Sequence, residues 1–163
     1  MNRKLQRGGG ATLFVKNTLS ARLVESISIC CNNLFESVTV EIELKQKKHI
    51  LVSCMYRKPG SNLEELNEQV EKMLRLHRNK NLYVCGDFNV NLLKYNSHQQ
   101  TRHFMDMFFS LWLLPLITKP TRLNSTTESL IDNIFTNVLE TEHHSGASSL
   151  ITCQCSQFAE NNL

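Results

Sequence analysis

Segments with two different hydrophobic periods follow one another along this chain. Residues 38–44, VTVEIEL, carry an apolar residue at every second position, with Thr39, Glu41 and Glu43 between them. This alternation predicts a strand with one face in solvent. Residues 49–56, HILVSCMY, are apolar almost throughout, which predicts a strand covered on both faces. We expect further strands at residues 11–16, 81–87 and 129–138.

Two other segments carry apolar residues at helical spacing. Ser61 and Glu64 match a capping box, and the helix behind them is expected to bury five residues. These are Leu63, Leu66, Val70, Met73 and Leu74. The second helix is predicted over residues 98–114, with an aromatic and methionine stripe in the core. The stripe comprises Phe104, Met105, Phe108, Leu111 and Trp112. Strands that alternate with helices predict a layered α/β domain.

The pattern becomes weaker toward the end of the chain. Pro115 and Pro120 bracket a short extended piece at 116–119, and after Glu140 no closing element is predicted. We therefore divide the chain into a partial domain, residues 1–140, and a divergent tail, residues 141–163. The length of 163 residues suits one domain.

Charge and cysteine content narrow the class of protein only slightly. The formal net charge of +3 is a weak lean toward anionic partners and does not by itself indicate nucleic-acid binding. The six cysteines include no C-x-x-C pair, so structural zinc is not indicated, and we expect free, inert thiols in a reducing compartment. No apolar stretch follows the basic residues at 1–10 and no run of 18 apolar residues occurs, so neither a secreted nor a membrane-spanning protein is expected. An intracellular location, nuclear or cytoplasmic, is expected.

Polar residues that could carry chemistry follow three of the predicted strands. Tyr56 ends one strand, Asp87 and Asn89 follow another after Gly86, and Asp132 lies near the last. Open α/β sheets gather reactive groups at such strand ends. An Asp there can accept a proton from an attacking water, and an amide or a tyrosine hydroxyl can donate to a phosphate oxygen. The set therefore suits hydrolysis of a phosphodiester.

Structural explanations remain open for each of these residues. The sequence G-D-x-N is a common turn after a strand, because Gly, Asp and Asn all tolerate turn geometry. Tyr56 could be a core aromatic residue, and Asp132 could be a buried carboxylate that accepts local backbone hydrogen bonds.

Four segments in order, RGGGATLFVKNTL, CMYRKPGSN, YVCGDFNVNLLK and TRLNSTTESLIDNIFTN, carry a family resemblance. Together they resemble the endonuclease/exonuclease/phosphatase superfamily, and within it the apurinic-type endonuclease domain of non-LTR retrotransposons. The resemblance covers about residues 7 to 138. It implies a four-layer α/β sandwich, two sheets flanked by helices, which is incomplete here.

The resemblance also implies roles for individual residues. Asp87 would be the general base, Asn89 and Tyr56 would face the phosphate, and Asp132 would orient a catalytic histidine. DNA is the expected substrate and partner, with Mg²⁺ as cofactor. The expected substrate contacts are Arg57, Lys58, Lys119, Arg122, Ser125, Thr126 and Ser129.

Two landmarks of the family are not found in this sequence. The metal-binding Glu should precede the glycine-rich segment, so Glu25, Glu36, Glu41 and Glu43 cannot replace it by order. The closing Ser-Asp-His reads Ser156, Gln157 and Phe158, so the metal ligands are unknown and His143 and His144 are poor substitutes. We therefore expect the chain to be inactive on its own.

The alternatives to a retrotransposon endonuclease also follow from this sequence. The first is a non-catalytic remnant that binds nucleic acid weakly or associates with itself through an exposed sheet edge. The second is a phosphatase or lipase of the same superfamily, which the segment TRLNSTTESLIDNIFTN does not favour. A reverse transcriptase in the full element would support the endonuclease interpretation.

Overall fold

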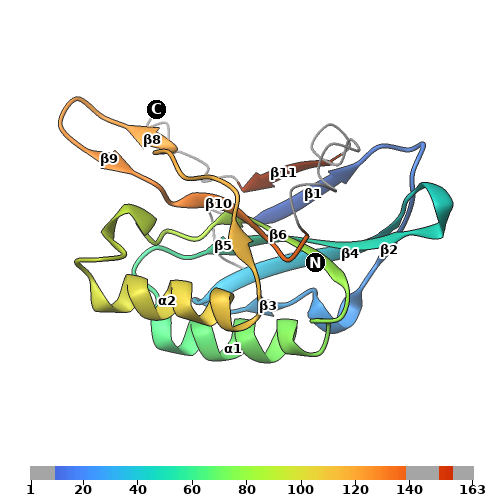
Figure 1. The fold of residues 1–163 in the computed structure, drawn as a ribbon, viewed down its shortest axis with the longest axis horizontal. Helices are drawn as coiled ribbons and strands as arrows, with labels where there is room; N and C mark the ends of the chain where they lie inside the picture. The colour runs from blue at the N-terminus through green and yellow to red at the C-terminus, as the bar shows by residue number, and fades with distance from the viewer. Residues whose placement is uncertain (1–9, 139–150, 156–163) are drawn as a thin grey trace.

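A computed structural model describes residues 10–138 and 151–155 of the chain. Most of the strands in this part form one large sheet (Figure 1). Its members are β2 (Ser20–Leu23), β3 (Cys30–Cys31), β4 (Phe35–Glu43), β5 (His49–Arg57), β6 (Asn81–Asp87), β7 (Leu114–Pro115) and β10 (Asp132–Thr136). The strand order is β2, β4, β5, β6, β10, β7, with β3 also paired to β4. Self-association through an edge of this sheet stays a prediction.

The other strands form two small antiparallel sheets. The hairpin strands β8 (Arg122–Leu123) and β9 (Glu128–Ser129) pair with each other and project from the body of the domain (Figure 1). Strand β1 (Ala11–Val15) pairs with β11 (Ile151–Cys155), with Ala11 opposite Cys155. Strand β11 lies in the segment for which the sequence predicted no closing element, so that expectation is corrected.

The two helices lie side by side on one face of the large sheet, and β1 covers the other (Figure 1). Helix α1 (Leu63–Arg75) connects β5 to β6, which run parallel as this crossover requires. Helix α2 (Gln99–Ser110) follows β6. Three short 3₁₀ turns complete the described part: η1 (Glu25–Ile27), η2 (Lys45–Lys47) and η3 (Leu92–Lys94).

Helix α1 buries the five residues that its periodicity predicted. Its cap differs from the prediction, because Asn62 and not Ser61 is the N-cap. The Oδ1 atom of Asn62 accepts hydrogen bonds from the backbone N–H groups of Glu64 and Glu65, at 3.0 and 3.3 Å. The hydroxyl of Ser61 donates instead to the carbonyl of Leu34. Asn is as good an N-cap as Ser, so sequence preference alone could not decide between them.

Strand β4 corrects the prediction of a solvated face at two of its three polar residues, whereas Glu43 is exposed as predicted. Thr39 and Glu41 are buried on the side of the helices. The hydroxyl of Thr39 lies 3.0 Å from the carbonyl oxygen of Ile27 and 2.9 Å from Ser53 Oγ. Because buried polar groups are tolerated when they are hydrogen-bonded, a strand with this alternation can still be covered on both faces.

An aromatic cluster fastens α2 to the sheet directly behind the end of β6. The ring centroid of Phe88 lies 5.5 Å from that of Phe104 and 5.4 Å from that of Phe135. Phe108 stacks on Phe135 at 3.9 Å. Four members of the predicted stripe are buried, namely Phe104, Met105, Phe108 and Leu111, but Trp112 is 82% exposed and does not belong to the core.

The short strand β7, Leu114–Pro115, lies just before the piece at 116–119 that was expected to be extended. One smaller expectation needs correction. Cys54 is disulfide-bonded, so the prediction of free thiols fails there, whereas Cys30 and Cys31 are free.

Candidate functional site

The candidate site is a row of polar side chains across four neighbouring strands. Asp87 of β6 lies opposite Tyr56 of β5 on one side and opposite Asp132 of β10 on the other. Tyr56 in turn lies opposite Glu36 of β4. Residues opposite each other on adjacent strands point to the same face of a sheet. All four therefore lie on the face that β1 covers, at the end of the sheet where β5 and β6 finish.

Gly86 allows β5 and β6 to approach closely immediately before Asp87. A Cβ atom at this position would lie 1.8 Å from the carbonyl oxygen of Met55. No side chain fits there, so the glycine is required by the strand pairing that places Asp87 beside Tyr56. This is a structural role for the glycine of the GDFN segment.

The carboxylate of Asp87 is buried and held on both sides. It is 2% exposed, its Oδ1 accepts from the backbone N–H of Asn89 at 3.0 Å, and its Oδ2 accepts from Arg122 Nη2 at 2.9 Å. Burial raises its pKa, and the negative charge of Asp132 acts in the same direction. The hydrogen bond from Asn89 and the charge of Arg122 oppose this rise. The net effect is a raised pKa, which makes the carboxylate a stronger proton acceptor.

Asn89 and Arg57 fix the loop that follows Asp87. Asn89 has a positive φ of 49°, and its side-chain Nδ2 donates to the backbone carbonyl of Arg57 at 2.8 Å. Arg57 returns the contact, because its Nη1 donates to the carbonyl of Asn89 at 3.0 Å. Its Nη2 donates to the carbonyl of Ser61. The two residues therefore clamp the chain in a conformation that non-glycine residues rarely adopt.

Arg57 is buried, whereas a side chain that contacts a substrate phosphate would be expected at the surface. Its side chain is 7% exposed, its Nε lies buried without a hydrogen-bond partner, and burial lowers its pKa. The guanidinium faces the protein, whereas Lys58 beside it is exposed and donates to Asn33 Oδ1 at 2.8 Å. The structure therefore gives Arg57 a positioning contact with the loop.

Asp132 and Arg122 form the outer side of the row. The Oδ2 atom of Asp132 accepts from Thr121 Oγ1 at 2.9 Å and lies 3.7 Å from Arg122 Nε. One guanidinium, 44% exposed, thus bridges the carboxylates of Asp87 and Asp132. Thr121 was not predicted from the sequence.

The other predicted substrate contacts lie near Arg122 along the chain. Lys119, Ser125 and Thr126 are exposed, and Ser129 is half-buried on β9. Ser125 and Thr126 lie in the turn that joins β8 to β9, at the outer end of the projecting hairpin (Figure 1). The structure places them outside the row and records no contact between them and Asp87.

A family model described as "Endonuclease-reverse transcriptase" matches residues 50–156 of the chain. The chain belongs to the endonuclease-reverse transcriptase family. The match begins in β5 and includes Tyr56, Asp87 and Asp132. Among curated proteins, no sequence matches.

Two solved structures show the fold of this family member. The endonuclease domain of TRAS1, a telomere-specific non-LTR retrotransposon, has 18% identity and a TM-score of 0.60 over 77% of this chain. The human nocturnin catalytic domain, with a bound sulfate anion, has 15% identity and a TM-score of 0.51 over 80%. These likenesses confirm the predicted endonuclease/exonuclease/phosphatase fold, and the family model confirms the family resemblance. This chain spans 66% of the TRAS1 domain and 60% of the nocturnin chain.

The described residues of this endonuclease-reverse transcriptase family domain do not fit a metal ion. In residues 10–138 and 151–155, no three His, Cys, Asp or Glu side chains gather closely enough to hold one. The cationic group between Asp87 and Asp132 is the guanidinium of Arg122. Hard oxygen ligands such as these carboxylates suit Mg²⁺, but here they are engaged by hydrogen-bond donors.

Glu36 is the member of the row that was not predicted to be a site residue. Its order in the chain argued against it, yet β4 places it opposite Tyr56, with its Oε1 3.8 Å from the thiol of Cys30. The alternation of β4 could have placed Glu36 from the sequence. Glu36 lies on the same face of this strand as Val38, Val40 and Ile42, which is the face covered by β1.

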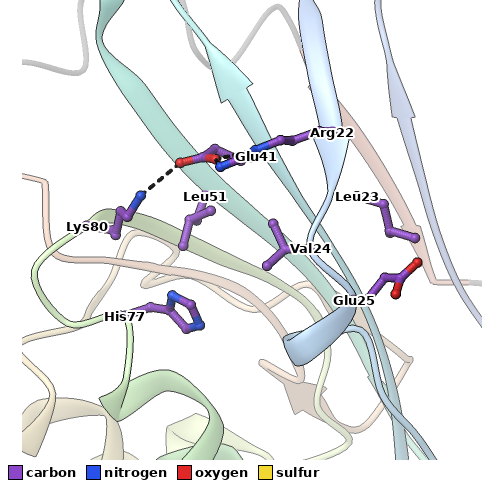
Figure 2. Close-up of a pocket in the computed structure, with 8 residues that line it drawn as sticks. All are labelled: Arg22, Leu23, Val24, Glu25, Glu41, Leu51, His77 and Lys80. Carbon is purple, nitrogen blue, oxygen red and sulfur yellow. Dashed lines mark hydrogen bonds and ion pairs between the residues drawn. The ribbon is translucent and has the colours of Figure 1, made fainter.

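A second cluster of charges surrounds Glu41, on the opposite face of β4 from the row (Figure 2). Its carboxylate is 5% exposed and accepts from Lys80 Nζ at 2.9 Å and from Arg22 Nε at 2.6 Å. These two cations lower the pKa of Glu41 to about 2. The ion pairs of Glu41 hold β2 and the residue before β6 against β4. This cluster is separate from the row.

No helix in the described part of the chain is long and apolar enough to cross a membrane.

Proposed function

We propose that this chain carries the water-activating and phosphate-binding part of a DNA endonuclease site of non-LTR retrotransposon type. The observation that carries the proposal is Asp87, a buried carboxylate of raised pKa at the centre of the row. A buried carboxylate beside a tyrosine, a second carboxylate and an arginine is suited to general-base attack on a phosphodiester. The likeness to the TRAS1 endonuclease domain supports DNA as the substrate.

Each member of the site has one task in this proposal. Asp87 takes the proton of the attacking water, and Asp132 orients the groups beside it. The hydroxyl of Tyr56 donates to a phosphate oxygen that gains charge in the transition state. Asn89 would turn its amide, now on the carbonyl of Arg57, toward the phosphate.

The projecting hairpin supplies the contacts with the DNA backbone. Arg122 begins it beside Asp87, and Ser125 and Thr126 are exposed at its turn. Lys119 lies just before the hairpin and Ser129 ends it. Arginine, lysine and hydroxyl side chains are the usual donors to phosphate oxygens, and such contacts set the register of the protein on the duplex.

Mg²⁺ is part of the proposal as a family expectation. A bound Mg²⁺ would polarise the phosphodiester and stabilise the leaving oxygen. The described residues do not assemble a site for it, so none of the roles above depends on the ion. We expect this chain to have no significant nicking activity by itself, because groups that act as a unit fail together.

A second candidate function is that of a non-catalytic nucleic-acid-binding remnant. The observation that favours it is the ion pairing of Arg122 with both Asp87 and Asp132, which places a cationic side chain of the protein itself between the two carboxylates. In that case the hairpin would still hold DNA through phosphates, with an affinity that falls steeply as the salt concentration rises.

Nicking of supercoiled plasmid in the presence of Mg²⁺ tests the inactivity that is expected of this chain under both candidates. The parent chain is compared with Asp87→Ala and with Asp106→Ala, which removes an exposed carboxylate of α2 that accepts a hydrogen bond from the hydroxyl of Tyr95. We expect no nicking by any of the three and salt-sensitive duplex binding by all. Nicking by the parent and by Asp106→Ala that disappears in Asp87→Ala would establish the enzyme and overturn the expected inactivity. Weak duplex binding that is insensitive to Arg122→Ala and Lys119→Ala would refute the DNA contact.

A further inference from the structure

Trp112 occupies a position in the fold that normally belongs to glycine. Helix α2 ends at Ser110, and the chain then turns through Leu111 and Trp112. The N–H of Leu113 donates to the carbonyl of Phe108 at 3.0 Å, and the N–H of Trp112 donates to that of Phe109 at 2.9 Å. This pair of hydrogen bonds is a Schellman motif with Trp112 at its left-handed residue, at φ of 61°.

Burial of the side chain does not offset the energetic cost of the left-handed conformation of Trp112. Its neighbours Leu111 and Leu113 are buried and fix the turn, while the indole of Trp112 is held in solvent. A left-handed conformation is unfavourable for any residue with a Cβ atom, and glycine would avoid it. Strain that burial does not offset is a reason to look for a function of the side chain.

The indole borders a hollow of about 310 Å³ whose other walls are mostly polar and basic. Its lining residues are Arg75, Arg78, Asn79, Ser110, Leu111 and Trp112. Arg75 and Arg78 come from the last turn of α1 and the residues after it, where the helix dipole favours cations. An exposed aromatic ring beside two guanidinium groups combines a stacking platform with phosphate-binding groups.

The charge distribution points to an anionic occupant. Residues 69–80 carry four Lys and Arg against one acidic residue, so this segment alone has the +3 formal charge of the whole chain. Arg75 pairs with Glu71 and Lys80 with the buried Glu41. For Arg78, no ion pair is recorded within the described residues.

We propose that Trp112, Arg75 and Arg78 form a binding site for single-stranded nucleic acid, in which the indole stacks on an unpaired base and the arginines bind the adjoining phosphates. The site lies before β6 begins, whereas Asp87 ends that strand, so the two are roughly 20 Å apart along it. It is therefore additional to the proposed endonuclease site and does not depend on catalysis there.

The fluorescence of Trp112 gives a direct test, since it is the only tryptophan in the chain. A short oligothymidylate is titrated into the parent protein. We expect saturable quenching of the indole emission that high salt reverses. Binding that is recorded by anisotropy of a labelled oligothymidylate, without any change in indole emission, would overturn the proposal. A change in emission that depends only on protein concentration would also overturn it, in favour of contact between two copies.

Trp112→Gly separates a failure to fold from a loss of binding. Glycine is the preferred residue at this position, so the variant should melt at a temperature roughly 2–8 °C higher than the parent. Its affinity for the labelled oligothymidylate should fall roughly tenfold or more. Undiminished affinity in this variant would refute the stacking role.

The arginines are tested through the salt dependence of binding. Arg78→Ala should lower the slope of log affinity against log salt by about 0.7, the value for one phosphate of a single strand. The matched control is Arg102→Ala, which removes an exposed arginine of α2 that donates to the carbonyl of Asn96. Equal slopes for the two variants would exclude Arg78 from the site.

Discussion

Gly86 lies immediately before Asp87, and its replacement by alanine tests how strand pairing holds the candidate site. The added Cβ atom would lie 1.8 Å from the carbonyl oxygen of Met55, 2.8 Å from its carbonyl carbon and 3.0 Å from its nitrogen. All three atoms belong to the backbone of β5. No rotation of a side chain can relieve the overlap, so β5 and β6 must separate.

The size of the effect follows from these distances. A carbon atom and a carbonyl oxygen in contact are roughly 3.3 Å apart, so the strands must separate locally by about 1.5 Å. That shift breaks about two ladder hydrogen bonds, worth about 1 kcal/mol each, in addition to about 1–3 kcal/mol for overpacking. We expect Gly86→Ala to lower the free energy of unfolding by about 3–5 kcal/mol. For a chain of this length the melting temperature should fall by roughly 6–20 °C.

Gly60→Ala is the matched control. Gly60 has a positive φ of 73°, but among the described residues, apart from its two chain neighbours, no heavy atom lies within 4 Å of the position of an added Cβ. Only backbone strain of about 1–2 kcal/mol is expected there. Urea denaturation followed by circular dichroism measures both variants against the parent. If Gly86→Ala loses no more stability than Gly60→Ala, the close approach of β5 and β6 is not as described.

Two further predictions concern buried carboxylates and the pH dependence of stability. Burial raises the pKa of Asp87 in the folded state, so its contribution to stability is present below pH 3.8 and is lost as the pH rises through the folded value. Asp87→Asn should therefore be more stable than the parent near neutral pH, with a difference that vanishes below about pH 4 in thermal melts; a less stable variant at pH 7 would contradict this reasoning. The contribution of Glu41 to stability depends on pH in the opposite direction. Its pKa is lowered from 4.5 to about 2, so its stabilisation of the folded state is lost as the pH falls through that range. Glu41→Gln should be less stable by about 1–3 kcal/mol at pH 7, and parent and variant should converge toward pH 2 in urea titrations; a constant difference across that range would indicate that the charge of Glu41 is unimportant.

The strands and the central residues of the candidate site could be predicted because their signals are local. The apolar run of β5 and the G-D segment at the end of β6 identify two strand ends, and parallel pairing then brings Tyr56 and Asp87 together. Asp132 was predicted to be a site residue from the resemblance of its segment to a known motif. Its position opposite Asp87 agrees with the expectation that the two residues lie close together.

The features that were missed depend on contacts between distant segments. Arg57 follows a strand and has the composition of a phosphate contact, but the loop after Asp87 folds back over it. Glu41 was expected in solvent because its partners, Arg22 and Lys80, come from elsewhere in the chain. Trp112 continues the helical period of α2, and only the Schellman turn takes it out of the core. Periodicity cannot report such contacts, because it describes one segment at a time.

The pairing of β1 with β11 has a consequence for how this domain folds. Ala11 lies opposite Cys155, so the two strands of this small sheet come from nearly opposite ends of the sequence. During synthesis on the ribosome, β1 cannot pair in this sheet until β11 has emerged. Such non-local pairing slows folding, because the entropy of closing a long loop is lost before the contact forms. The apolar face of β4, β5 and β6 that β1 covers should therefore be completed late, after the helix side of the sheet.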